Sequence, residues 1–224
     1  MASVEKYSDF SSVNNILRHC AREVANSSNT DIDKDRSDQN YSFSGHESAK
    51  AAYHSFKDRL NEIYCYNRRN TVKMCGWIVT APADLAPSRY QEFFRVTNDF
   101  LVQRYGAENV IQSTVHMDEA TPHLHFNFVP TVKCDNHEGF SEKLCAKEVI
   151  SKAELRNFHP DLQNYLTKNG LGDAHVHTGI TKAQGGNRTV REMKAERNHE
   201  VTMEWGNLKN WGKERLHEHT LSNR

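Results

Sequence analysis

Sixteen residues near the middle of the chain, Val115–Pro130, read V-H-M-D-E-A-T-P-H-L-H-F-N-F-V-P. His123 and His125 are separated by one residue, so both rings leave the same face of a strand. His116 closes an apolar run that also has the pattern of a strand. Turn-forming residues lie between the two runs, and Pro122 disfavours helix there. We therefore predict two antiparallel strands joined by a turn, which place His116 opposite the other two histidines.

Three converging imidazoles suit a divalent transition metal, and three protein ligands leave positions open for a substrate oxygen. We predict His116, His123 and His125 as these ligands. Glu119, at the turn, would act as a further ligand or as a general base, and Asp118 would orient a ligand imidazole. The chain has 13 histidines, so a His-x-His pair also arises by chance, and surface histidines are the alternative interpretation. The His-Glu-x-x-His pattern of helix-borne metalloprotease sites is absent.

The charges of the chain balance. Lys and Arg number 29 and Asp and Glu also number 29, which counts against indiscriminate nucleic-acid binding but leaves room for a local basic cleft. Basic residues cluster in one connection, at Arg68, Arg69 and Lys73, and near the C-terminus, at Lys182, Arg188, Arg191, Lys194 and Arg197.

Cysteine usage and hydropathy indicate a reducing cytoplasm. The five cysteines are odd in number and never spaced as C-x-x-C, so free thiols are the simplest account. No apolar run approaches the roughly twenty residues that span a bilayer, and the N-terminus lacks the pattern of a secretory signal. We therefore expect no membrane segment in this chain.

Hydrophobic periodicity predicts an α+β fold, with a mostly antiparallel sheet of about five strands packed with helices. Helices are predicted over residues 11–25, with Ser11 or Ser12 as the N-cap, and over residues 46–66, 88–105 and 152–168. Besides the two central strands, strands are predicted over residues 2–8 and 72–80, within 140–150, and over 174–180. A second His-x-His pair, at His175 and His177, has no third ligand at a clear spacing and is interpreted as surface.

Three motifs carry a resemblance to a known family. They are His116-x-Asp-Glu-x-x-Pro-His-x-His125, His19-Cys-Ala-Arg22 and Asn40-Tyr41. With the segment 187–194, they resemble the MobV-type plasmid mobilisation relaxases, also called the Pre/Mob or plasmid recombination family, which are histidine-hydrophobe-histidine single-strand DNA endonucleases. The resemblance implies a relaxase palm fold and a catalytic domain over residues 1–200, followed by a polar, helical C-terminal extension over residues 201–224.

The resemblance also implies a reaction. A relaxase nicks one strand of plasmid DNA at an origin of transfer, stays attached to the 5′ phosphate and later rejoins the ends. His19 would be the nucleophile, Glu119 its activator and Arg22 the residue that positions the phosphate, with a manganese or magnesium ion at the three histidines. The implied DNA contacts are Arg22, Asn40, Tyr41, Arg68, Arg69, Lys73, Arg188 and Arg191. The implied partners are single-stranded or hairpin origin DNA and a coupling protein, in the bacterial cytoplasm.

Two other functions are compatible with the sequence. One is a nickase of the rolling-circle replication initiator type with a tyrosine nucleophile, for which Tyr7 and Tyr41 are candidates, although Tyr41 would also suit stacking on a base. A neutral imidazole is available at pH 7, whereas a tyrosine must lose a proton of pKa near 10, which favours His19. The other function is a non-catalytic DNA-binding module with a structural metal, in which His19 is an ordinary surface residue of an amphipathic helix.

Overall fold

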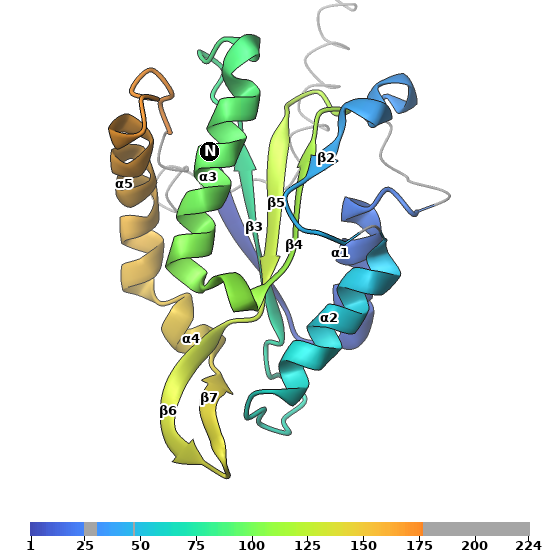
Figure 1. Cartoon of the computed structure of the whole chain (residues 1–224), viewed down its shortest axis with the longest axis vertical. Helices are drawn as coiled ribbons and strands as arrows, with labels where there is room; N and C mark the ends of the chain where they lie inside the picture. The colour runs from blue at the N-terminus through green and yellow to red at the C-terminus, as the bar shows by residue number, and fades with distance from the viewer. Residues whose placement is uncertain (25–30, 47, 177–224) are drawn as a thin grey trace, which may run out of the picture. The chain divides into compact units, whose positions relative to one another are not determined.

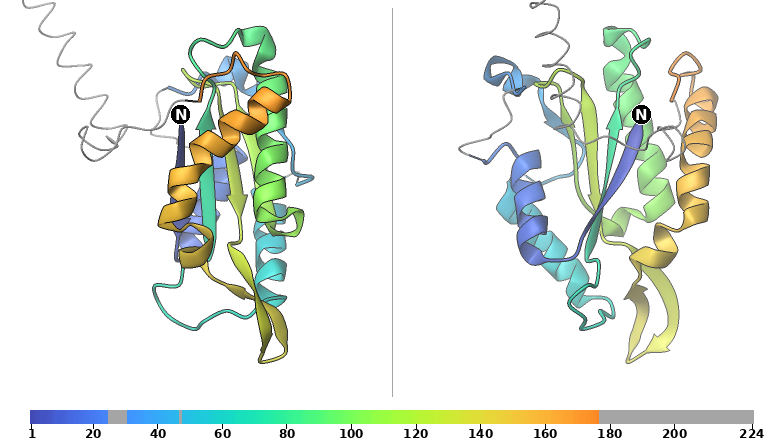
Figure 2. Two further views of the ribbon diagram at one scale, coloured as in Figure 1. Left: turned by 90° about the vertical axis from the view of Figure 1, so that its left-hand side faces the viewer. Right: turned by 180° about the vertical axis from the view of Figure 1, so that it is seen from behind.

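A five-stranded antiparallel sheet lies between two layers of helices (Figure 1, Figure 2). The computed structural model describes residues 1–24, 31–46 and 48–176. The strands are β1 (Ala2–Tyr7), β2 (Tyr41–Ser42), β3 (Met74–Thr80), β4 (Val110–His116) and β5 (His123–Phe128), in the spatial order β1-β3-β5-β4-β2. Every neighbouring pair is antiparallel. The predicted α+β fold is therefore confirmed.

The helices divide between the two faces of the sheet. Helices α1 (Phe10–Cys20) and α2 (Ala49–Asn61) cover one face, and α3 (Tyr90–Tyr105) and α5 (Lys152–Lys168) cover the other. The short elements are α4 (Ala146–Val149) and three 3-10 turns, η1 (Lys34–Gln39), η2 (Pro87–Arg89) and η3 (Ala107–Asn109).

Alternation along β5 explains how one strand serves both layers. All six residues of β5 are buried. Leu124, Phe126 and Phe128 join the apolar cluster under α3 and α5, where Trp77 stacks on Phe158 with ring centroids 3.6 Å apart. The alternate residues, His123, His125 and Asn127, face α1. The sheet therefore presents polar residues to one helix from a strand whose other side is core.

Helix α1 buries a narrow apolar stripe of Val13, Leu17 and Cys20, at the i, i+4, i+7 spacing of one helix face. Its N-cap is Asp9, whose carboxylate accepts a hydrogen bond of 2.7 Å from the Ser12 amide. The prediction of Ser11 or Ser12 as the cap was wrong, because the helix begins one turn earlier. The predicted end at residue 25 was also wrong, because the helix closes at Cys20, two residues before a left-handed turn.

The other predicted helices keep their centres, and α2 and α3 differ from their predictions at one or both ends. Helix α2 begins after the N-cap Ser48 and ends at Asn61, so the prediction of 46–66 was too long on both sides. Helix α5 matches its prediction. Helix α3 ends at Gly106, whose φ of 88° is a conformation that favours glycine.

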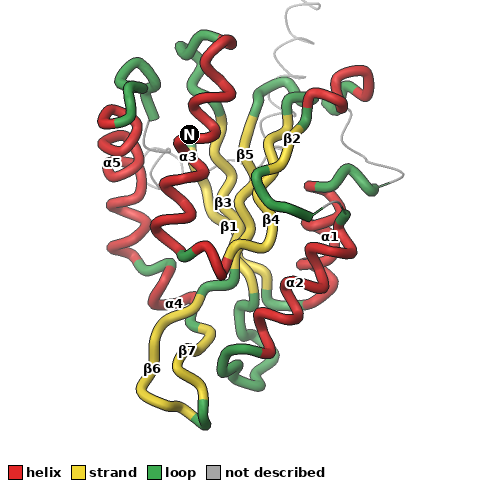
Figure 3. The backbone as a smooth tube through the Cα atoms, in the orientation of Figure 1, coloured by secondary structure: helices red, strands yellow, loops and turns green. Residues whose placement is uncertain are grey.

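A second, two-stranded sheet was not predicted as such, although one of its strands lies within residues 140–150, where a strand was predicted. Strands β6 (Thr131–His137) and β7 (Phe140–Leu144) form a hairpin that projects from one end of the main sheet (Figure 3). Arg59 of α2 anchors it through a hydrogen bond of 2.6 Å to Glu142. The Tyr64 amide donates to the carbonyl oxygen of Glu142, so the hairpin is fixed to the α2–β3 connection at the same place.

Several predictions concern the C-terminal part of the chain. Residues 174–176 are not in a strand, so that part of the predicted strand 174–180 was wrong. The rest of that strand, the polar extension 201–224 and the basic residues Arg188 and Arg191 lie outside the described residues. Within residues 1–24, 31–46 and 48–176, no helix has the length and apolar character needed to cross a membrane. All five cysteines lie in these ranges and are free thiols.

Candidate metal and nucleophile site

The three predicted metal ligands converge at one end of the central hairpin. His116, the last residue of β4, is the Cα partner of His123, the first residue of β5. The ring centroids of His116, His123 and His125 lie 4.8–5.2 Å apart in pairs. Their exposed fractions are 0%, 9% and 5%. The strand pairing predicted from the sequence therefore brings these rings into one buried cluster.

Backbone carbonyls fix which ring nitrogens face the cluster. His116 Nε2 lies 3.1 Å from the carbonyl oxygen of Cys20, and His123 Nδ1 lies 2.9 Å from that of Thr121. A carbonyl oxygen only accepts, so these two nitrogens carry the protons. The lone pairs then belong to His116 Nδ1 and His123 Nε2. This tautomer assignment is the one that metal-bound histidines usually show.

The inward nitrogens fit a divalent cation. Among the described residues, His116 Nδ1 is buried without a hydrogen-bond partner. His123 Nε2 and His125 Nε2 lie 3.1 Å apart, close to the separation of about 3 Å between neighbouring ligand atoms on bonds of about 2.1 Å. A buried, unpartnered nitrogen is costly unless something else satisfies it.

Burial keeps the imidazoles of His116 and His125 neutral. Desolvation lowers the pKa of His116 to about 3, with the charge of Arg22 acting in the same direction. Desolvation also lowers the pKa of His125 well below its ordinary value. Neutral imidazole is the form that binds a metal, so the cluster is prepared for one at pH 7.

His19, near the end of α1, lies directly against this cluster. Its ring centroid is 5.3 Å from that of His116 and 5.2 Å from that of His125, both edge-to-face. Burial, and then the charge of Arg22, lower the pKa of His19. Donor atoms of His19, His116 and His125 lie within 4.8 Å of one another, and so do those of His116, Glu119 and His123. His19 is therefore placed either to attack a substrate at the cluster or to serve as a ligand itself.

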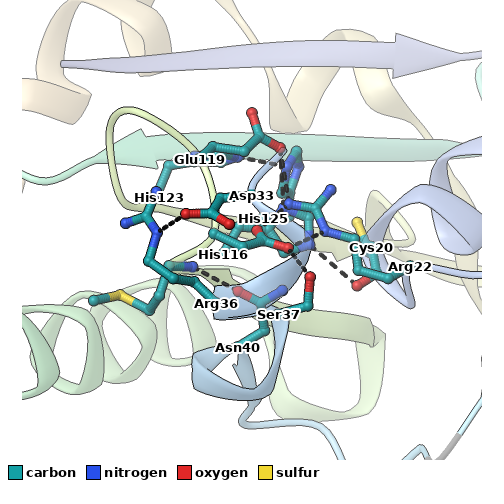
Figure 4. A network of polar contacts seen from close by, with 12 residues as sticks. Cys20, Arg22, Asp33, Arg36, Ser37, Asn40, His116, Glu119, His123 and His125 are labelled. Atoms are coloured by element: carbon teal, nitrogen blue, oxygen red, sulfur yellow. Dashed lines mark hydrogen bonds and ion pairs between the residues drawn. The ribbon is translucent and has the colours of Figure 1, made fainter. Parts of the chain in front are cut away.

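Arg22, Asp118 and Glu119 form an ion network beside the histidines. Figure 4 labels Arg22 and Glu119 of this network together with the three histidines. Arg22 Nε donates to Asp118 Oδ2 at 3.0 Å, and Arg22 Nη2 donates both to Asp118 Oδ1 and, at 2.8 Å, to Glu119 Oε1. Asp118 also accepts from Ser37 Oγ at 2.9 Å. Burial would raise the pKa of Asp118, but the hydrogen bonds from Arg22 and Ser37, with the charge of Arg22, hold it well below its usual range.

This network differs from one prediction. Asp118 was expected to orient a ligand imidazole, yet its described hydrogen bonds run to Arg22 and Ser37. The reason is geometric, because the carbonyl oxygens of Cys20 and Thr121 already occupy the outer nitrogens of His116 and His123. Ser37 and the Cys20 carbonyl gave no sequence signal, since neither belongs to a motif.

The two candidate tyrosine nucleophiles are placed less favourably than His19. Tyr41 is the Cα partner of Val115 and packs against the cluster under α3, on the face of the sheet opposite the histidines. Burial raises its pKa to about 12. Tyr7 is on the α1 face, but its hydroxyl donates to Glu5 at 2.8 Å. Burial, followed by the charge of Glu5, raises the pKa of Tyr7, which disfavours the phenolate needed for attack.

The remaining predicted DNA contacts lie in two places. Asn40 is beside the site, and its Oδ1 accepts from the Met117 amide at 2.7 Å. Arg68 and Lys73 belong to the α2–β3 connection, where the Arg68 guanidinium lies 5.3 Å from the Tyr66 ring centroid, and Arg69 is exposed. This connection enters β3 at Met74, whereas the histidines meet the other end of the strand. Met74 and Thr80 are six residue steps apart along β3, so the basic connection and the histidines are separated by roughly 20 Å.

Fold and site together define a class, an α+β protein with a buried histidine centre between the central hairpin of its sheet and its N-terminal helix. A family model described as "Plasmid recombination enzyme" matches residues 1–195. The chain therefore belongs to the plasmid recombination enzyme family.

Relatives with this description occur in several bacteria. One from Bacillus thuringiensis is 32% identical over 167 residues, which are 72% of this chain and 36% of the relative. One from Lactiplantibacillus plantarum is 30% identical over 193 residues, 81% of this chain and 49% of the relative. One from Streptococcus agalactiae is 28% identical over 185 residues, 80% of this chain and 35% of the relative. The chain thus spans between a third and a half of the length of these curated relatives.

Solved structures with the same fold include the MobM relaxase domain (MOBV; Mob_Pre) bound to plasmid pMV158 oriT DNA. The Mn-bound crystal structure at pH 6.8 has a TM-score of 0.72 and 26% identity, and the match covers 88% of this chain and 97% of that chain. The Mn-bound structure at pH 4.6 has a TM-score of 0.70 and 26% identity, covering 87% and 98%.

Proposed function

We propose that this chain is a relaxase that cleaves one DNA strand at a plasmid origin of transfer, with a divalent cation, and retains the 5′ phosphate on His19. The observation that carries the proposal is the edge-to-face contact of His19 with His116 and His125, at one end of the hairpin that bears the buried histidines. Family membership supports it, and so does the likeness to the Mn-bound MobM relaxase domain on oriT DNA.

Manganese or magnesium would be held by His116 through Nδ1 and by His123 and His125 through Nε2. Imidazole ligands favour manganese of the two on grounds of softness. When bound, the cation supplies positive charge that offsets the charge developing on the non-bridging oxygens of the phosphate. The protein's share is to hold the three rings in place, and the carbonyl oxygens of Cys20 and Thr121 fix the tautomers of two of them, His116 and His123.

In the proposed reaction a ring nitrogen of His19 attacks the phosphorus in line with the 3′ oxygen. The nitrogen–phosphorus bond forms as the phosphorus–oxygen bond to the 3′ oxygen breaks, and that oxygen leaves as a 3′ hydroxyl once it is protonated. The other ring nitrogen must lose its proton, and Glu119 is the carboxylate assigned to accept it. The phosphoramidate keeps the strand ends available for rejoining, because the 3′ hydroxyl can attack it in reverse.

Arg22 would neutralise a further phosphate oxygen. Its Nε and Nη2 are committed to carboxylates, but among the described residues its Nη1 is buried without a hydrogen-bond partner. A guanidinium with one unsatisfied nitrogen is suited to an anion arriving beside the histidines.

The wider assignment follows the same proposal. The catalytic domain would extend over residues 1–200, and Asn40, Tyr41, Arg68, Arg69, Lys73, Arg188 and Arg191 would contact origin DNA, single-stranded or as a hairpin. The protein would act in the bacterial cytoplasm, where free thiols persist, and would pass the nicked strand to a coupling protein.

The test is a cleavage assay on supercoiled DNA of the plasmid that encodes the chain, with manganese, resolved on a denaturing gel. Wild type, His19→Ala and Tyr41→Phe are compared, each with and without EDTA. The expected result is a metal-dependent protein–DNA adduct that His19→Ala abolishes and Tyr41→Phe retains. An adduct in His19→Ala that Tyr41→Phe lacks would refute the histidine nucleophile.

One observation favours a second candidate, a DNA-binding module with a structural metal. The donor atoms of His19, His116 and His125 lie within 4.8 Å of one another, so His19 is able to complete a closed ligand set. In that case no variant forms an adduct, and His19→Ala weakens manganese binding. In the relaxase, manganese binding survives His19→Ala.

A further inference from the structure

A buried carboxylate beside the site accepts hydrogen bonds from two residues that are distant from it in the sequence, Arg22 and Ser37. Asp118 is 0% exposed and lies in the turn between β4 and β5. We propose that Asp118 and Ser37 are positioning residues: together they set the Arg22 guanidinium and, through it, hold Glu119 beside His19. The inference rests on the proposed function and deepens it, because it assigns the control of Arg22 to residues outside the catalytic motifs.

The Asp118 carboxylate binds the Nε–Nη2 edge of the Arg22 guanidinium. Arg22 Nε and Nη2 both donate to Asp118, the two-bond geometry that fixes a guanidinium in plane as well as in place. The same Nη2 reaches Glu119 Oε1 at 2.8 Å. Since Asp118 occupies the Nε–Nη2 edge, Arg22 meets Glu119 through Nη2 and does not form a bidentate pair with it. Asp118 therefore limits the contact of Arg22 with Glu119 to the hydrogen bond from Nη2.

The backbone at Arg22 needs this restraint. Arg22 has a φ of 55°, a left-handed conformation that costs a non-glycine residue about 1 kcal/mol or more. The turn directs the side chain from the end of α1 toward Asp118, while the Arg22 amide donates to the carbonyl oxygen of His19 at 3.1 Å. The position of the guanidinium is therefore linked directly to the residue proposed as the nucleophile.

A segment distant in sequence holds Asp118 itself, and Figure 4 labels its residues Asp33, Ser37 and Asn40. Ser37 Oγ donates to Asp118 Oδ2 at 2.9 Å, the same oxygen that receives Arg22 Nε. The Asp33 amide donates to the Asp118 carbonyl oxygen at 2.7 Å, and Asn40 Oδ1 accepts from the Met117 amide at 2.7 Å. The segment that contains η1 thus forms hydrogen bonds both with the backbone of the β4–β5 turn and with the Asp118 carboxylate. Among the described contacts of this segment, the hydrogen bond from Ser37 acts on the carboxylate and not on the backbone of the turn.

Ser37→Ala is consequently the mild probe, and Ser42→Ala is its matched control. Ser42 Oγ donates to the carbonyl oxygen of Ser113 at 2.9 Å and has no described contact with Asp118 or Arg22. In the manganese-dependent assay, Ser37→Ala should lower kcat for nicking by roughly tenfold, the size expected for one hydrogen bond to a charged group. Asp118→Asn should lower it by roughly a hundredfold. Ser42→Ala should match wild type.

A double-mutant cycle separates positioning from a merely structural role. If Asp118 acts through Arg22, then Asp118→Asn changes kcat by less than about twofold in an Arg22→Ala background, and the manganese affinity of Asp118→Asn stays within about twofold of wild type. Full additivity in the cycle, or a large loss of manganese affinity, overturns the proposal. So does Ser37→Ala behaving as Ser42→Ala does.

A readout without DNA keeps the test independent of the relaxase reaction. In nitrogen-15 NMR of the full chain, the Arg22 Nε–H signal should exchange slowly with water in wild type and Ser42→Ala. It should exchange at least about tenfold faster in Asp118→Asn, since the hydrogen bond that protects it is weakened. Equal exchange in wild type and Asp118→Asn refutes the positioning of Arg22. An inactive wild type with the expected exchange pattern refutes the relaxase proposal alone.

Discussion

The chain contains three His-x-His pairs, at His123/His125, His175/His177 and His217/His219, and the histidines that the structure describes differ in their surroundings. His123 is buried, with its Nε2 3.1 Å from that of His125. The side chain of His175 is 58% exposed, and its Nδ1 lies 2.8 Å from Asp84. A metal ligand needs a lone pair held among other donors, and burial and a fixed tautomer provide this at His123 but not at the exposed His175.

His123→Ala should therefore lower the affinity for Mn²⁺ by roughly 100-fold or more, since changes to residues behind the ligands alone cost 10- to 100-fold. His175→Ala removes a histidine from a His-x-His pair of the same spacing and should leave the affinity unchanged. Electron paramagnetic resonance measures free Mn²⁺ directly during a titration. Equal affinities in the two variants would rule out a metal centre at the hairpin.

The sequence was sufficient to predict the histidine cluster but not to predict the contacts around it. His116 and His123 are seven positions apart, so a strand period of two and one turn place them opposite each other. Arg22 and Asp118 are 96 positions apart, and Ser37 and Asp118 are 81 apart. Such pairs depend on how α1 and the η1 segment pack on the sheet, and local pattern carries no information about that packing.

The close packing of the sheet requires a glycine in β3, the second strand in its spatial order. Gly76 of β3 lies between Glu5 of β1 and Asn127 of β5. A Cβ at Gly76 would lie 2.5 Å from Asn127 Oδ1 and 3.3 Å from the Tyr7 ring. Asn127 is almost fully buried, with its Nδ2 3.5 Å from Cys20 Sγ, so it has little room to move.

Gly76→Ala should therefore destabilise the fold by about 1–3 kcal/mol, the usual cost of overpacking a buried site. Gly45→Ala is the control, because no atom lies within 4 Å of a Cβ at that position. Its effect should stay within about 0.5 kcal/mol, as for an ordinary surface substitution. Urea unfolding compares the two variants with wild type. If Gly76→Ala and Gly45→Ala lower the free energy of unfolding by the same amount, the close approach of Asn127 and Tyr7 is not the reason that β3 needs a glycine.

Elements with a strong period were predictable, and the elements that lacked one were not. Helix α5 carries Phe158, Leu162 and Leu166 on one buried face, so its ends followed from the pattern. The β6–β7 hairpin has little apolar alternation, because it extends from the sheet and is held by the ion pair of Arg59 with Glu142. The edge strand β2 is two residues long, too short for any period.

Burial of the histidine cluster should couple the stability of the whole chain to pH. Without metal, the folded protein resists protonation of His116, whose pKa burial lowers to about 3, and of His125, whose pKa burial lowers well below its ordinary value. The unfolded chain takes up those protons near pH 6.5. Below that pH the unfolded state binds more protons than the folded state, so the free energy of unfolding must fall as the pH falls.

In EDTA, lowering the pH from 7.5 to 5.5 should therefore cost the wild type roughly 2–3 kcal/mol through these two residues, at about 1.4 kcal/mol per group for each pH unit below 6.5. His125→Gln cannot take up a proton at that position, so its loss over the same pH range should be smaller by about 1 kcal/mol, whatever its stability at pH 7.5. His175→Gln, at an exposed site, should lose as much as wild type. Urea unfolding at both pH values gives all three differences. If the free energy of unfolding is unchanged or higher at pH 5.5, the folded cluster accepts protons. Its nitrogens would then not be held as free lone pairs for a cation.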